Sequence, residues 1–402
     1  MRFLFSLFLS LSLLTNLSSQ IIIRSKINTE KTDADIRTGA ERTEVYLAWL
    51  KGKNVAVVAN QTSKINNTSL VDSLIALKIK VVKIFCPEHG FRGDADNGED
   101  VANTNDKKTG LPIISLYGDH TKPKPADLKG VDVVVYDIQD VGVRCYTYVT
   151  TMTYVMEACA EQKKTFVVLD RPNPNGYYVD GPTLEPAYKS FVGIHAVPLV
   201  YGMTIAEYAK MVNGEKWLTN GVQADLKTVE CQGYSHLDWY QLPVAPSPNL
   251  PNMASVYLYP SLCLFEGTVM SVGRGTDLPF QVVGHPNLKN GAYEFTPTTR
   301  AGAKTPPFQG QLCHGHDLHE FAMLYVRDYK GIYLYWLLSC YKDMPDKNAF
   351  FNDFFEKLAG TKTLRQQIID GKTEEQIKSS WMPGLNMFKV TRKKYLLYED
   401  FE

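Results

Sequence analysis

The chain has 402 residues, of which 44% are hydrophobic and 21% are charged. This ordinary globular composition excludes a disordered chain, and the length is too great for one ordinary core, so we expect two domains. Lys and Arg together number 43, as do Asp and Glu, and a chain without net charge gives no electrostatic reason to expect nucleic acid or an anionic membrane as its main partner.

The N-terminus has the pattern of a secretory signal peptide. Arg2 precedes an apolar run at residues 3–14, and small polar residues follow that run. The run is short for a transmembrane helix, and no Cys follows it to carry a lipid. We therefore predict a signal peptide at residues 1–20 and an exported protein, periplasmic or secreted, without a stable membrane anchor.

Short apolar runs rich in Val predict strands that are buried on both faces of a parallel sheet. These runs lie at residues 54–60, 81–86, 131–138 and 165–170. Helices are predicted between them at residues 70–77 and 148–162, where apolar residues recur at helical spacing.

This order of strands and helices predicts right-handed βαβ units. We expect an α/β protein with a Rossmann-like parallel sheet in an N-terminal domain at residues 40–190. A second, smaller α/β (α+β) domain is expected at residues 191–402.

Polar loops follow the carboxyl ends of the predicted strands, the edge where open α/β sheets bind ligands. Asn60 follows the first strand, and the sequence "PEHGFRG" at residues 87–93 follows the second. The ionisable residues of this second loop are Glu88, His89 and Arg92. Two interpretations stay open: Glu88 is a general acid whose pKa is raised by desolvation, or Glu88 and Arg92 form a structural ion pair. The first strand is not followed by GxGxxG, so we expect no dinucleotide, and no other cofactor is indicated.

The loop "DIQDVGVRCYTY" at residues 137–148 interleaves hydrogen-bonding side chains with aromatic rings. A sugar needs both, with polar groups at the edge of its ring and a flat surface against its face. The candidate residues of this loop are Gln139, Asp140, Arg144 and Tyr146. The structural alternatives are that Asp140 caps the following helix and that the tyrosines belong to the core, and for Tyr148 the helical spacing favours the core.

The second half of the chain contains several further signals. Thr204 to Glu207 forms a capping box that opens a helix, which gives Glu207 a structural role. A loop rich in Pro and Asn at residues 243–253 contains Asn249, and the segment "LFEGTVMSVGRGT" contains Glu266 and Arg274. Glu266 is either the second acid of a glycosidase pair or a buried carboxylate tied to a turn. Helices that end near a glycine are predicted at residues 350–360 and 363–371.

Metal and nucleophile motifs are weak. The segment "CHGHDLH" at residues 313–319 lacks the spacing of recognised zinc sites, and HExxH does not occur, so we expect no metal. GxSxG is absent as well, which argues against a serine hydrolase. The seven cysteines are scattered without CxxC spacing, and we expect most of them to be buried, inert thiols.

Taken together, these motifs resemble one family. "VANQTS", "FCPEHGFRGD", "DIQDVGVRCYTY", "LDRPNPNG", "VYGMTIAE", "PSPNLP" and "YPSLCLFEGT…SVGRGT" occur in order from about residue 42 onward and are similar to motifs of the exo-β-N-acetylmuramidases known as NamZ. The resemblance implies hydrolysis of β-1,4-linked N-acetylmuramic acid (MurNAc) from the non-reducing end of peptidoglycan fragments. It also implies an active site in the cleft between a Rossmann-like domain and a second α/β domain.

On this resemblance the expected partners are peptidoglycan-derived muropeptides or saccharides in which MurNAc is linked to N-acetylglucosamine (GlcNAc). Glu88 is the first choice for the acid, and Glu266 and Asp140 compete as the second group, with His89 as a further catalytic candidate. Because MurNAc carries a lactyl carboxylate, an arginine should bind it, and Arg92, Arg144 and Arg274 are the candidates. The remaining expected substrate-binding residues are Asn60, Gln139, Tyr146 and Asn249.

Two other functions compete with this one. A periplasmic binding protein for cell-wall sugars would share the two-domain plan and the export signal, but binding alone does not require Glu88 beside His89 in a shaped loop. A hydrolase of the amide bonds of peptidoglycan would commonly use zinc, for which the sequence offers no convincing ligand set.

Overall fold

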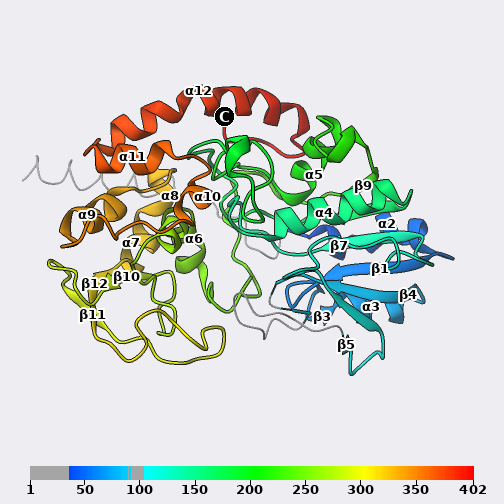
Figure 1. Ribbon diagram of the computed structural model, residues 1–402. Helices are drawn as coiled ribbons and strands as arrows, with labels where there is room; N and C mark the ends of the chain where they lie inside the picture. Colours follow the sequence, from blue (N-terminus) through cyan, green and yellow to red (C-terminus); the bar gives the residue numbers. More distant parts are fainter. Residues whose placement is uncertain (1–35, 89, 92–103) are drawn as a thin grey trace, which may run out of the picture.

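The computed structural model describes residues 36–88, 90–91 and 104–402. The predicted signal peptide at residues 1–20 lies outside the described residues, as do His89 and Arg92. Figure 1 shows a sheet with its helices at one end of the molecule and a mainly helical part at the other.

The N-terminal half is built on a seven-stranded sheet in the order β5-β6-β4-β1-β7-β8-β9. Neighbouring strands are parallel except β5 and β6, which are antiparallel. The strands in chain order are β1 (Asn54–Ala59), β4 (Lys80–Cys86), β5 (Thr104–Asn105), β6 (Pro112–Ser115), β7 (Val133–Asp137), β8 (Thr165–Leu169) and β9 (Asp225–Val229). The four apolar runs of the sequence form β1, β4, β7 and β8, so those predictions are confirmed.

Helices cover both faces of this sheet, and for that reason its strands are apolar at nearly every position. On β1, Val55 and Val57 pack into one hydrophobic cluster, whereas Ala56 and Val58 pack into another. The first cluster also takes residues of α2 (Thr43–Leu50) and α3 (Leu70–Ala76). The second takes residues of α4 (Tyr148–Glu161) and α5 (Ile205–Gly214). A small hairpin of β2 (Lys64–Ile65) and β3 (Thr68–Ser69) precedes α3.

The capping box predicted for α5 is present. The hydroxyl of Thr204 accepts a hydrogen bond from the backbone N–H of Glu207, and Glu207 Oε2 accepts one from the N–H of Thr204 at 2.8 Å. Glu207 is also bonded to the buried His236 and to the backbone N–H of Leu397. These contacts confirm a structural role for Glu207.

The second half is mainly helical. Its central helix α6 (Met253–Leu262) continues into the 3₁₀ turn η5 (Cys263–Gly267). A three-stranded antiparallel sheet consists of β10 (Val282–His285), β12 (Cys313–Asp317) and β11 (Tyr293–Phe295), in that spatial order. Five helices cover the remainder before the long terminal helix: α7 (His319–Leu324), α8 (Val326–Tyr329), α9 (Tyr335–Asp343), α10 (Phe355–Ala359) and α11 (Thr363–Ile369).

The helix predicted at residues 350–360 is shorter than expected. Phe351 forms a β-bridge with Thr268, which holds the chain in extended conformation, so that α10 begins only at Phe355. Gly360 ends α10 at φ +77°, as the sequence indicated for a C-terminal glycine. The prediction for residues 363–371 is confirmed by α11.

The final helix α12 (Glu374–Arg392) runs across the top of the molecule in Figure 1, and the chain after it returns to the N-terminal half. There Tyr398 donates a hydrogen bond to Asp170 Oδ2 at 2.5 Å. The sequence predicts a domain boundary at residue 190. In the structure β9 is the edge strand of the first sheet, so this sheet also takes residues from beyond the predicted boundary.

Two further expectations concern the chain as a whole. All seven cysteines are buried and free, where the sequence predicted buried, inert thiols for most of them. Within the described ranges, no helix has both the length and the apolar character that are needed to cross a membrane.

Candidate active site

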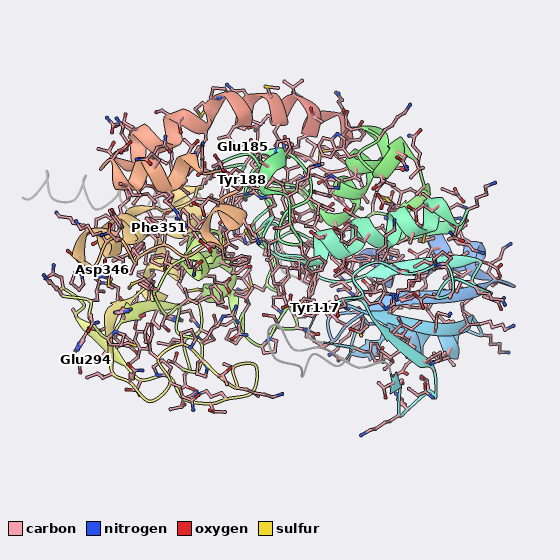
Figure 2. The ribbon with its side chains drawn as sticks, viewed as in Figure 1. Tyr117, Glu185, Tyr188, Glu294, Asp346 and Phe351 are labelled. Carbon is pink, nitrogen blue, oxygen red and sulfur yellow. The ribbon has the colours of Figure 1, made fainter. Side chains whose placement is uncertain are left out.

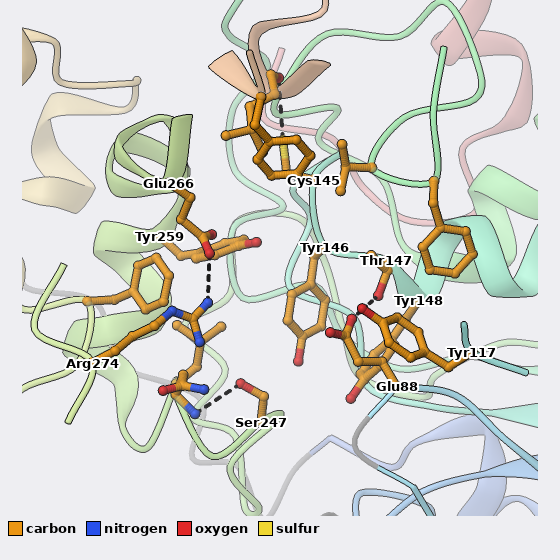
Figure 3. Close-up of a pocket in the computed structure, with 17 residues that line it drawn as sticks. Glu88, Tyr117, Cys145, Tyr146, Thr147, Tyr148, Ser247, Tyr259, Glu266 and Arg274 are labelled. Carbon is orange, nitrogen blue, oxygen red and sulfur yellow. Dashed lines mark hydrogen bonds and ion pairs between the residues drawn. The ribbon is translucent and has the colours of Figure 1, made fainter. Parts of the chain in front are cut away.

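A pocket of about 290 Å³ lies where residues of the two halves meet (Figure 3). The N-terminal half contributes Glu88 from the loop after β4 and the segment 145–148 at the start of α4. The second half contributes Asn249, Tyr259 of α6, Glu266 of η5 and Arg274. Tyr117, which also lines the pocket, lies on the side of the sheet domain that faces the second half in Figure 2.

Glu88 is held at the start of α4. Its side chain is buried to all but 7%, and Oε2 accepts a hydrogen bond of 2.9 Å from the hydroxyl of Thr147, the N-cap residue of that helix. The N-terminus of a helix carries a partial positive charge, which interacts favourably with a carboxylate. Burial, followed by the charge of Glu88, raises the pKa of Tyr148. The loop after β4 therefore presents a carboxyl group to the pocket, as the sequence predicts.

Glu266 enters the pocket from the opposite side in Figure 3 and forms an ion pair with Arg274. The distance from Arg274 Nη2 to Glu266 Oε2 is 2.7 Å, and the guanidinium lies over the ring of Phe280 at 5.0 Å. Gly273 and Gly275 flank Arg274 with φ angles of +77° and +82°, a conformation that favours glycine. The glycines of "VGRGT" thus shape the turn that carries Arg274 to Glu266.

Aromatic rings line the space between the two carboxyl groups. The ring of Tyr146 lies 4.7 Å from that of Tyr148 and 5.7 Å from that of Tyr259, in both cases edge to face. Tyr259 in turn contacts Phe280 at 5.2 Å. Burial raises the pKa of Tyr146 well above its usual range, so this phenol is neutral at physiological pH. A flat, neutral surface between polar groups suits the face of a sugar ring.

Arg144 does not line the pocket, although the sequence suggested that it binds substrate. It is 1% exposed, and its two terminal nitrogens donate four hydrogen bonds of 2.7–2.9 Å to backbone carbonyls. The acceptors are the carbonyls of Pro182, Val197, Leu358 and Ala359. These contacts give Arg144 a structural role, in which it joins segments from both halves.

Asp140 and Gln139 are also placed in the framework. Asp140 Oδ2 accepts hydrogen bonds from the hydroxyl of Tyr201 and, at 2.8 Å, from the N–H of Gly142, and burial raises the pKa of Asp140 to about 6. Asp140 does not cap α4 either, because that helix begins after Thr147. Gln139 Nε2 donates to the carbonyls of Asp140 and Pro172 at 2.8 Å. Of the two candidates for a second catalytic group, only Glu266 lines the pocket.

The remaining predicted residues divide between the pocket and its surroundings. Tyr146 and Asn249 line the pocket, and Asn249 Nδ2 donates to the carbonyl of Gly302 at 2.9 Å. Asn60 lies in a separate, smaller cavity, where its Oδ1 accepts hydrogen bonds from the N–H and hydroxyl of Thr62.

Several pocket residues were missed in the sequence. Tyr259 opens the motif segment that carries Glu266, Phe280 lies four residues after the end of that segment, and Thr147 follows Tyr146 in another motif. Position in or beside a motif was the signal that would have found these three residues. Tyr148 belongs to the core as predicted, at 1% exposed, yet it also contributes to the pocket wall. Tyr117, Phe191 and Phe354 carried no such signal.

Known proteins similar to this chain cover nearly all of it. Residues 55–254 match the family described as exo-β-N-acetylmuramidase NamZ, N-terminal, and residues 257–398 match its C-terminal counterpart. The peptidoglycan β-N-acetylmuramidase NamZ of Bacillus subtilis (strain 168) is 42% identical over 381 residues, which make up 88% of this chain and 89% of that protein.

Two crystal structures of DUF1343 family proteins from Bacteroides fragilis NCTC 9343 have the same fold. One is 48% identical with a TM-score of 0.85, and the other is 30% identical with a TM-score of 0.75. In both comparisons the match covers 91% of this chain and 99% of the other.

Proposed function

The chain belongs to the family of exo-β-N-acetylmuramidases, which makes it a glycosidase, and on that premise we propose that Glu88 and Glu266 are its two catalytic carboxyl groups. The substrate that we propose is a peptidoglycan fragment with a β-1,4-linked MurNAc at its non-reducing end. The observation that carries the proposal is the presence of two carboxyl groups on opposite sides of one aromatic pocket (Figure 3).

The two carboxyl groups have different surroundings, which suit different roles. Glu88 is buried at the pocket wall beside the hydroxyl of Thr147, and we assign to it the transfer of a proton to the glycosidic oxygen. Glu266 forms an ion pair with Arg274 on the other side of the pocket, and we assign to it the role of nucleophile, base or partner of the acetamido group. Proton donation to the leaving oxygen and stabilisation of the positive charge at the anomeric carbon would then come from opposite sides of the sugar.

Arg274 is the best candidate for recognition of the lactyl carboxylate. It is the arginine of the described residues that lines the pocket, since Arg144 is bonded to four carbonyls elsewhere. Only one terminal nitrogen of Arg274 is bonded to Glu266, and Nη1 has no hydrogen-bond partner among the described residues. A guanidinium so placed offers a donor to an incoming carboxylate.

We further propose that the protein acts after export, in the periplasm or outside the cell. The apolar run at residues 3–14 supports this proposal. Export would place the enzyme where peptidoglycan fragments are released.

Release of free MurNAc from MurNAc-GlcNAc tests the function and distinguishes it from sugar binding alone. We expect the wild-type enzyme to release MurNAc and Glu88→Gln to lower kcat about 10²–10⁴-fold, the usual contribution of a general acid. A MurNAc glycoside with 2,4-dinitrophenol as leaving group needs little protonation, so Glu88→Gln should retain most activity on it, whereas Glu266→Gln should lose activity on both substrates.

Glu294→Gln is the matched control, because Glu294 lies on β11, does not line the pocket and is well separated in Figure 2 from the pocket residue Tyr117, with its side chain 61% exposed. It should behave as wild type. Absence of MurNAc release by the wild-type enzyme would refute the function, and near-normal turnover of MurNAc-GlcNAc by Glu88→Gln would refute the role of Glu88 alone.

A further inference from the structure

The part of the pocket beyond Glu88 is lined by aromatic rings. Tyr117 lies there, on the side of Glu88 that is away from Glu266 and Arg274 (Figure 3). The ring of Phe191, which also lines the pocket, lies 6.0 Å from the ring of Tyr117 at an interplanar angle of 67°. Two rings at so steep an angle form a corner, and we call Tyr117 and Phe191 the aromatic corner.

Tyr117 is placed beside Glu88 by the parallel pairing of β4 and β6. Cys86 of β4 and Ser115 of β6 are partners in the register, and the N–H of Leu116 donates to the carbonyl of Cys86 at 2.8 Å. Glu88 and Tyr117 each follow their register position by two residues. Neighbouring strands lie about 4.8 Å apart, so Tyr117 leaves the sheet one strand away from the proposed acid.

Phe191 lies at the tip of a tight turn. Two backbone hydrogen bonds between Ser190 and Gly193, of 2.9 and 3.0 Å, close this turn, and both residues at its tip, Phe191 and Val192, line the pocket. The base of the turn rests on Arg144, because a Cβ atom at Gly193 would lie 3.1 Å from Arg144 Cδ. The ring of Phe191 is therefore carried by a short turn that packs against the framework of the pocket.

The aromatic corner suits an uncharged ligand. In the described lining of the pocket, charge is carried by Glu88, Glu266 and Arg274, and the last two form their ion pair on the side away from Tyr117 (Figure 3). An acidic group placed against Tyr117 and Phe191 would lose its hydration without gaining a partner, whereas the C–H groups of a neutral sugar ring pack well on aromatic rings. The acidic sugar and the neutral sugar thus have different ends of the pocket.

The proposed acid decides which end takes the leaving sugar. A general acid protonates the glycosidic oxygen, and the leaving sugar is attached to that oxygen, so it lies at the Glu88 end of the pocket. We propose that the aromatic corner binds the ring of the leaving sugar, and that Tyr117 and Phe191 thereby determine which leaving groups the enzyme processes efficiently. This inference rests on the proposed function and on the role assigned to Glu88.

The test compares kcat/KM for MurNAc-GlcNAc with kcat/KM for the trifluoroethyl β-glycoside of MurNAc, whose leaving alcohol needs protonation as a sugar does but has no ring. We expect Phe191→Ala to lower kcat/KM about 10-fold or more for the disaccharide and less than about 2-fold for the trifluoroethyl glycoside. Phe191→Tyr keeps the ring and should keep most activity on both. The matched control is Tyr188→Ala, which should change neither value, because Tyr188 ends the 3₁₀ turn η3 (Pro186–Tyr188) and does not line the pocket.

If Phe191→Ala does not fold, Phe191→Leu takes its place, since Leu fills much of the same volume and has no ring; it should show the same selective loss. The wild-type enzyme should itself favour the disaccharide over the trifluoroethyl glycoside by about 10-fold or more. Equal kcat/KM values for the wild type, equal losses on both substrates, or an unchanged disaccharide value in the variants would each overturn the proposal while the proposed function stands. Failure of the wild-type enzyme to cleave either substrate would instead refute the function itself.

Discussion

Replacement of Arg144 by Met is the sharpest test of how the two halves are joined. Met keeps much of the apolar stem and removes the guanidinium, which is bonded to four carbonyls. Two of these, at Leu358 and Ala359, lie at the end of α10, and the other two, at Pro182 and Val197, lie more than 150 residues earlier. The substitution therefore removes hydrogen bonds that connect distant segments and leaves the side chains of α2 to α5 unchanged.

The magnitude follows from the number of bonds and from burial. Hydrogen bonds to a charged group contribute about 1.5–3 kcal/mol each, so four of them amount to roughly 6–12 kcal/mol before compensation. Arg144 is fully buried, which lowers its pKa, and removal of a buried cation relieves several kcal/mol of desolvation. Val197 also keeps a second donor, the N–H of Leu184. We expect a net loss of about 3–5 kcal/mol in the free energy of unfolding.

Urea unfolding followed by circular dichroism measures this loss, with Arg144→Lys as a comparison. Lys keeps the charge but lacks the planar fork that reaches four acceptors, so it should lose most of the same stability. A loss below about 1 kcal/mol for Arg144→Met would refute the structural role. So would normal stability combined with a raised KM for MurNAc glycosides and an unchanged KM for GlcNAc glycosides, because that result would place Arg144 at the lactyl carboxylate.

Three other predictions concern different parts of the molecule. Burial raises the pKa of Asp170 to about 7, so the stability that this group contributes is present below about pH 4 and is lost as the pH rises through 7. Asp170→Asn should reduce the slope of the unfolding free energy against pH by up to roughly 1.4 kcal/mol per pH unit between pH 5 and 7. Urea titrations at several pH values measure this slope, and an unchanged slope would contradict the prediction. Gly142→Ala should lower the melting temperature, since Gly142 has φ +75° and a Cβ atom would lie 2.3 Å from Asn173; a thermal scan equal to wild type would show that the site relaxes. Arg274→Met should reduce kcat/KM about 10-fold or more for MurNAc glycosides relative to GlcNAc glycosides, and equal losses on both would argue against lactyl recognition.

The sheet could be predicted because its strands are buried on both faces. Residues 54–59 and 133–137 are apolar at nearly every position, and a run of that kind between helical segments has few alternatives. Glu88 could be assigned to the site because it follows the end of a predicted strand. Ligands bind at the carboxyl edge of a parallel sheet, and this edge can be located without knowing any tertiary contact. The start of α10 could not be found in this way, because it depends on a bridge from Phe351 to Thr268, a residue 83 positions earlier.

The direction of a polar side chain in a loop could not be predicted either. Arg144 and Tyr146 are two residues apart in one motif, yet Arg144 is enclosed by carbonyls and Tyr146 lines the pocket. The difference arises because backbone carbonyls at residues 182, 197 and 358–359 pack around Arg144 and accept its hydrogen bonds. The sequence around Arg144 does not specify that these distant segments lie there. The motif therefore identified the loop that builds the site and could not divide its residues between framework and pocket.

That division explains why a glycosidase pocket needs so many buried polar residues that never touch substrate. Glu88 and Glu266 belong to different halves of the chain, so their separation is set by how the halves are held together rather than by either loop alone. Arg144 joins the halves at α10, and the terminal segment joins them again where Tyr398 meets Asp170. Because the distance between the carboxyl groups governs what chemistry they perform on a sugar, these buried contacts act on catalysis through geometry. A variant that weakens these contacts should therefore lower kcat even though every side chain of the pocket is unchanged.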